Sequence, residues 1–225
     1  DRILIGRFSG AMPLGLYTKA FQLAAMPVEN IRMILWEVGI SPLSIIQNDR
    51  ERYRKFYAKS LSVISFIYMP FAVFMAIQSE EIVLLLLGGK WTSAAPLLRI
   101  FAIGGFVMPL IASFRVVMIS CGQAKKYVRW GIIYGSGMVL AFSIGINWGI
   151  AGVAMSYSVA CWLLFAFGLV YCLKETPVDA GLVVRTVSFP ALSSIFAGLV
   201  LLTFLSRFAI AGTFQAISVS VIIIG

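Results

Sequence analysis

The sequence predicts an all-α fold, a polytopic bundle of transmembrane helices. First, 60% of its 225 residues are hydrophobic and 12% are charged, whereas soluble domains hold about 45–50% and about 25%. Second, several uncharged runs reach about 20 residues, the length that crosses a bilayer as a helix. Third, basic residues cluster in every second loop, which is typical of membrane proteins. We therefore expect lipid to be the solvent of most of this chain.

The two ends of the sequence both fall within apolar stretches. Residues 1–10 are expected to be the end of a preceding helix, closed by a turn at Ser9–Pro13. The last residues, Val219–Gly225, are an apolar run that stops without a turn signal. We expect the chain to be a fragment of a longer membrane protein.

Seven further spans are expected after that first helix end. Trp130–Leu173 is uncharged but too long for one span, so we expect a turn at Asn147–Gly149. The short apolar piece Ile82–Leu87 is expected to be a helical turn at the outer surface. The expected spans are Leu16–Ile46, Ser60–Ser79, Pro96–Ser120, Gly131–Ile146, Ile150–Leu173, Thr186–Ser206 and a last helix over Phe208–Gly225.

The distribution of Lys and Arg predicts the orientation of these spans. Ten basic residues fall in the loops Gln47–Lys59, Cys121–Trp130 and Lys174–Arg185, against two, Lys90 and Arg207, in the opposite loops. Lys and Arg near the membrane mark the cytoplasmic side. The three basic loops are therefore predicted to lie inside.

Several classes of site have no support in the sequence. The net charge of +9 is attributed to the basic cytoplasmic loops, so no nucleic-acid partner is expected. There is no histidine and the three cysteines have no metal-ligand spacing. We expect no metal, no cofactor and no catalytic residues.

Charged residues inside the expected span Leu16–Ile46 are the strongest functional signal. At 100° per residue, the polar positions and one tryptophan fall within a sector of roughly 140°. These residues are Lys19, Gln22, Glu29, Arg32, Trp36 and Glu37. Pro27 lacks an N–H and is expected to kink or loosen this helix. Such a stripe fits a helix that lines an aqueous cavity, because intramembrane charges are costly and usually functional.

A structural interpretation of the same charges stays open. Glu29 and Arg32 are spaced i, i+3 and could neutralise each other. Lys19 and Glu37, like Arg99 and Arg115 of another span, could extend toward the membrane surface. If the cavity exists, its Arg and Lys suit an anionic cargo such as a lipid pyrophosphate.

Aromatic residues on the same helix have two interpretations as well. Tyr17, Phe21 and Trp36 could stack on the sugar faces of a cargo. Aromatic residues at helical spacing are more often packing residues or interface anchors.

Four segments together resemble the C-terminal half of bacterial polysaccharide flippases. The segments are Asp1–Phe8 with Leu14–Tyr17, Leu43 with Gln47, Asp49 and Arg50, Leu84–Trp91 with Ala94–Arg99, and Trp148–Ala154. Their order and spacing resemble the lipopolysaccharide and colanic-acid exporters of the multidrug/oligosaccharidyl-lipid/polysaccharide flippase superfamily. The resemblance covers nearly all of the chain.

The resemblance implies a fourteen-helix fold with a central cavity and alternating access. Residues 1–173 would be the C-terminal lobe, from the end of helix 7 to helix 12, and residues 174–225 two additional helices. The implied function is the flipping of undecaprenyl-pyrophosphate-linked oligosaccharides for polysaccharide export, as a multi-pass protein of the bacterial inner membrane. The implied partners are this cargo, membrane lipids and the polysaccharide polymerase or other assembly proteins.

The polar residues then receive roles by hypothesis. The predicted cavity residues are Arg32, Glu29, Gln22, Lys19, Trp36 and Arg2, with Arg32 and either Lys19 or Arg2 at the pyrophosphate. Glu29, Glu37 or Asp1 would couple a proton or sodium ion, because desolvation raises a carboxyl pKa.

Two other functions compete with this hypothesis. A multidrug or cation antiporter of the same superfamily should have an acidic, aromatic cavity, which this sequence does not favour. A membrane enzyme should show a large outer loop or an acidic metal motif. Asp49-Arg50-Glu51 is the nearest approach to one, and it lies in a basic loop.

Overall fold

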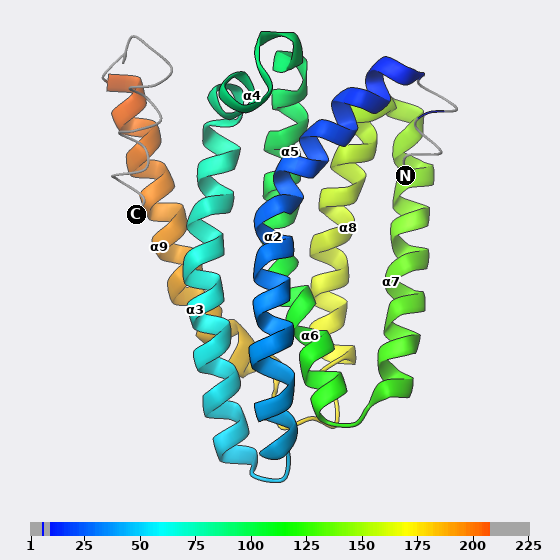
Figure 1. Ribbon diagram of the computed structural model, residues 1–225, viewed down its shortest axis with the longest axis vertical. Coiled ribbons are helices and arrows are strands. Elements are labelled where there is room, and N and C mark those ends of the chain that lie inside the picture. The colour runs from blue at the N-terminus through cyan, green and yellow to red at the C-terminus, as the bar shows by residue number, and fades with distance from the viewer. Residues whose placement is uncertain (1–5, 7–9, 208–225) are drawn as a thin grey trace.

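The computed structural model describes residues 6 and 10–207, and the side chains of this range except those of residues 28–39, 206 and 207. The described part is a bundle of long helices whose axes run roughly along the long dimension of the molecule (Figure 1). The elements are α2 (Ala11–Ile45), α3 (Arg50–Ile77), α4 (Ser79–Leu87), the 3₁₀ helix η1 (Gly89–Ala94), α5 (Ala95–Gly105), α6 (Met108–Ser120), α7 (Ala124–Gly145), the 3₁₀ helix η2 (Ile146–Trp148), α8 (Gly149–Tyr171) and α9 (Ala180–Arg207). The all-α transmembrane fold is confirmed.

Four described segments are long and apolar enough to cross a membrane. They are Arg50–Ile77, Gly89–Ser120, Ala124–Tyr171 and Ala180–Leu205. The third is folded back on itself at η2, as predicted, and α8 begins at Gly149 with a positive φ of 69°. With 35 residues, α2 is about 52 Å long, but it is not among the four apolar segments. The expected helices before Gly10 and over Phe208–Gly225 lie outside the described residues.

The expected span Pro96–Ser120 is two helices rather than one. α5 ends at Gly105 and α6 begins at Met108, so the chain leaves the regular helix at Phe106 and Val107. Pro109 stands in the first turn of α6 and lacks the N–H that a continuous helix would need there. The interruption lies inside the apolar segment Gly89–Ser120, so the expected span is confirmed, with a break in the helix that was not predicted.

The three basic loops lie at one end of the bundle, the lower end in Figure 1. They also contact one another. Arg54 at the start of α3 donates to the carbonyl of Pro177 (3.2 Å) and forms an ion pair with Asp179. The amide of Gln123 donates to the carbonyl of Glu175 (2.9 Å). The alternation of basic loops is thus confirmed as a grouping in space, and its assignment to the cytoplasmic side stays a prediction.

The buried contacts of α3 join it to two different parts of the chain. Toward α6, the hydroxyl of Tyr53 lies 2.6 Å from that of Ser120 and the hydroxyl of Tyr57 lies 2.8 Å from that of Ser113. These bonds satisfy polar groups that would be costly in an apolar core. Along its other side α3 packs against α9.

Candidate functional site

The orientation of α2 is set by an aromatic cluster on its inner face. The ring of Tyr17 lies 5.2 Å from that of Phe101 on α5, and the ring of Phe21 lies 5.6 Å from that of Tyr157 on α8. Tyr17 and Ala20 are fully buried. This face of α2 therefore belongs to the core of the bundle.

The cluster corrects one hypothesis about the cargo. Tyr17 has no exposed surface, and Phe21 is packed edge-on against Phe101 and Tyr157. The Tyr17 ring is therefore unavailable for stacking on a sugar, and the partly buried Phe21 ring is engaged in packing. Both serve packing, which was the alternative interpretation.

The opposite face of α2 carries the described polar residues. Lys19 and Gln22 are exposed, and Met26 on the same side is 65% exposed. By helical periodicity Glu29 falls beside this exposed face, whereas Arg32 falls at the border with the core face, about 20° from Phe21. The helix is continuous through Pro27, although Figure 1 shows it bent, with its N-terminal part inclined to the rest. The predicted stripe is therefore on one unbroken helix and begins on an exposed face.

The structure describes only some of the predicted site residues. The side chains of Glu29, Arg32, Trp36 and Glu37 lie outside the described residues, although their backbone is part of α2. Asp1 and Arg2 lie outside the described residues altogether. The roles of all these residues stay predictions.

Lys19 has a contact that the sequence did not suggest. Its ammonium nitrogen lies 6.0 Å from the centroid of the Trp91 ring, within the range of a cation–π contact. Trp91 belongs to η1 and follows Lys19 by 72 residues in the chain. The segment Leu84–Trp91 had been named from the sequence only for its resemblance to polysaccharide flippases.

Arg99 and Arg115, the two arginines of the expected span Pro96–Ser120, have partners of their own. Arg99 lies 3.6 Å from the carboxylate of Glu80 on α4, and both side chains are more than half exposed. The guanidinium of Arg115 lies 5.1 Å from the centroid of the Tyr127 ring. We therefore assign both arginines to structural contacts between helices.

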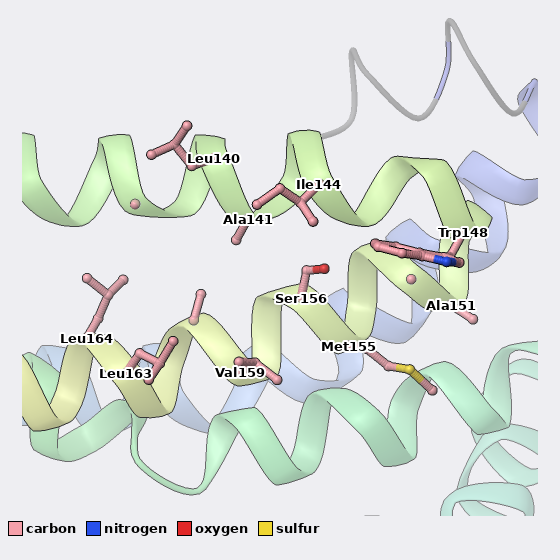
Figure 2. Close-up of a pocket in the computed structure, with 13 residues that line it drawn as sticks. Leu140, Ala141, Ile144, Trp148, Ala151, Met155, Ser156, Val159, Leu163 and Leu164 are labelled. Atoms are coloured by element: carbon pink, nitrogen blue, oxygen red, sulfur yellow. The ribbon is translucent and has the colours of Figure 1, made fainter.

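A groove with a volume of about 820 Å³ lies between α7 and α8 (Figure 2). In Figure 2, Leu140, Ala141 and Ile144 come from α7, whereas Ser156, Val159 and Leu163 come from α8. The lining is almost entirely apolar, and none of the predicted cavity residues contributes to it. Such a surface suits hydrocarbon and offers nothing to a charged or sugar head group, so the polar face of α2 remains the candidate site.

Because Lys19 and Gln22 are exposed, we predict that water reaches this face of α2. In a Cys121→Ser background, where Cys161 and Cys172 stay buried, Gln22→Cys should react with a membrane-impermeant maleimide. The reaction should be at least about tenfold faster than that of Ala20→Cys, whose side chain lies in the core.

A second control distinguishes a residue that faces water from one that faces lipid. Ile132 on α7 is 67% exposed but is expected to face lipid, so Ile132→Cys should stay unlabelled. Labelling of Gln22→Cys that is as slow as that of Ile132→Cys, from both sides of the membrane, would contradict an aqueous cavity along α2.

The chain is similar in sequence to known polysaccharide biosynthesis proteins. Residues 1–96 match the family model described as a polysaccharide biosynthesis protein. The chain is 27% identical over 178 residues to the teichuronic acid biosynthesis protein TuaB of Bacillus subtilis, covering 77% of this chain and 37% of that protein. It is 30% identical over 105 residues to the lipopolysaccharide biosynthesis protein WzxC of Escherichia coli, covering 47% and 21%.

A solved structure has the same fold. The chain superposes on the lipid II flippase MurJ, in an inward closed conformation, with a TM-score of 0.70 and 16% identity. The match covers 99% of this chain and 49% of that one. The chain thus spans about half or less of the length of the proteins it matches.

Proposed function

We propose that this chain is a polysaccharide flippase of the multidrug/oligosaccharidyl-lipid/polysaccharide superfamily and that it moves lipid-linked oligosaccharides across the inner membrane. The chain is a multi-pass membrane protein of the inner membrane. Its proposed cargo is an undecaprenyl-pyrophosphate-linked oligosaccharide destined for a surface polysaccharide. Its proposed partners are this cargo, the surrounding lipids and the enzymes that polymerise the product.

The observation that carries the proposal is the two-faced character of α2. One face is held in the core by Tyr17 and Phe21, so the helix cannot rotate its polar face inward. The other face exposes Lys19 and Gln22 in a helix long enough to cross the membrane. Ionisable groups persist at such depth where water or a polar ligand meets them.

The proposed mechanism follows from the chemistry of the cargo, whose head group is soluble in water and whose tail is soluble in lipid. The sugar and pyrophosphate head would occupy the polar face of α2, while the lipid tail stays in the bilayer. Two lobes would rock about this site to open it inward and then outward. The cargo can drive this change only if it binds the two states with different affinity. Glu29, Glu37 or Asp1 would couple the cycle to a proton or a sodium ion.

The competing hypothesis of a membrane enzyme called for a large outer loop or an acidic metal motif. The described residues contain no cluster that could hold a metal ion. The turns at the end opposite the basic loops are the short elements α4–η1 and η2. Neither of these turns adds a domain that could hold a catalytic site.

Deletion of the gene in its native host tests the proposal. We expect the lipid-linked oligosaccharide to accumulate on the inner leaflet and the surface polysaccharide to be lost, with both restored by the wild-type gene. Resistance to cationic dyes should not change. Normal polysaccharide together with raised dye sensitivity would instead support the multidrug antiporter.

A further inference from the structure

The turn between α4 and α5 contains a tryptophan whose place is determined by its backbone. α4 ends at Leu87 and is followed by Gly88, which has a positive φ of 83° that few other residues adopt. The N–H of Trp91 then donates to the carbonyl of Gly88 (3.0 Å), and the hydroxyl of Thr92 donates to the carbonyl of Gly89 (3.1 Å). Ala94 and Ala95 are buried at the end of the turn. The turn is therefore tied down on both sides of Trp91.

From this turn the Trp91 ring reaches the N-terminal part of α2. A Cβ atom added at Gly15 would lie 3.7 Å from two carbons of the ring, so the ring rests on the helix where that helix has no side chain. Lys19 follows Gly15 by four residues, one helical turn further along the same face. Its ammonium nitrogen lies 6.0 Å from the ring centroid.

We infer that Trp91 is a positioning residue that holds the Lys19 ammonium at the outer end of the polar face of α2, where it meets the pyrophosphate of the cargo. The inference rests on the proposed function. It goes beyond it by giving a role to a residue outside α2 and by placing one phosphate contact near the α4–η1 turn.

The physical reason lies in the flexibility of lysine. A lysine side chain has four rotatable bonds and loses much rotamer entropy when it binds. A π face attracts the ammonium without neutralising its charge. Lys19 would thus be ordered before the cargo arrives and would still be free to bind an anion, whereas a carboxylate partner would compete with the phosphate. This pre-ordering lowers the entropic cost of binding.

The first test does not depend on the cargo. In the full-length protein, acetylation of Lys19 by an amine-reactive reagent should be about threefold faster in Trp91→Leu than in the wild type, as expected when an exposed cation–π contact is lost. Trp91→Phe should lie between the two. Trp148→Leu removes an exposed tryptophan from the other turn at the same end and should leave the rate unchanged. An unchanged rate in Trp91→Leu would overturn the inference.

The second test uses undecaprenyl pyrophosphate as the probe. Trp91→Leu should weaken its binding about fivefold, with Trp148→Leu as the control. Once Lys19→Met has been introduced, adding Trp91→Leu should cost nothing further, because Trp91 would act only through Lys19. Losses that add would show that Trp91 supports folding or touches the probe directly, and would also overturn the inference.

The two tests separate the inference from the function on which it rests. If the wild type fails to bind the probe while Trp91→Leu still alters acetylation, the proposed function fails and the contact stands as structure only. If the wild type binds the probe and Trp91→Leu changes neither measurement, the function stands and the inference fails. Thermal unfolding of Trp91→Leu beside the wild type and Trp91→Phe shows whether a loss comes from misfolding.

Discussion

Arg32→Ala in the full-length protein is expected to lower export of the surface polysaccharide at least tenfold. A guanidinium bound to phosphate by charge-assisted hydrogen bonds contributes about 1.5–3 kcal/mol, which corresponds to a factor of about 10–100 in binding. Arg32→Lys should recover part of the activity, because lysine keeps the charge but not the paired N–H donors. Export is measured as surface polysaccharide at matched protein levels.

Glu29→Gln completes this experiment. If Glu29 couples the cycle to an ion, the amide should abolish the dependence of export on the proton or sodium gradient, because it cannot titrate. Lys90→Ala is the matched control, since it removes an exposed charge from the α4–η1 turn without touching α2. Unchanged export in both Arg32→Ala and Glu29→Gln would show that these residues only neutralise each other and that the mechanism is wrong.

Gly104→Leu should strongly destabilise the contact between α5 and α8. A Cβ atom at this position would lie 2.6 Å from the hydroxyl oxygen and 2.8 Å from the Cα of Ser158 on α8. The backbone of α8 cannot move away without breaking the hydrogen bond from Ser158 to the carbonyl of Ile100 (2.6 Å). Overpacking of this kind costs about 1–3 kcal/mol, so the unfolding temperature in detergent should fall.

Gly131→Leu is the control for this prediction. Gly131 lies in α7 with no atom within 4 Å of an added Cβ, so the same change of residue type should be nearly neutral. If both variants unfolded at the same temperature as the wild type, the close approach of α5 to α8 would not be present in the membrane.

Much of the fold follows from local patterns. The apolar runs predicted the places of α3, α7, α8 and α9, because the length of a spanning helix is set by the bilayer itself. The bounds of α8 agree to within two residues, whereas α3 begins at Arg50, ten residues before the expected span Ser60–Ser79. The turn at η2 follows from a break in that pattern. The gathering of the basic loops at one end follows from alternation alone, since each span reverses the direction of the chain.

Other features could not be predicted because they depend on contacts between distant residues. The sequence left open whether Tyr17 and Phe21 bind a sugar or pack in the core. Their edge-on contacts with Phe101 and Tyr157 show that they pack. The break between α5 and α6 was hidden within an uninterrupted apolar run. The contact of Trp91 with α2 joins segments that no local periodicity connects.

The sequence by itself determined that this protein is a membrane bundle and where most of its spans lie, and it predicted that α2 carries an intramembrane polar stripe. These features depend on the order of apolar and polar residues within each segment, and the bilayer selects apolar segments of the right length one by one. Only the tertiary structure decided which face of α2 is buried and that Trp91 contacts Lys19. Burial of a helix face depends on the shapes of neighbouring helices, and those neighbours are brought together by folding rather than by their order in the chain.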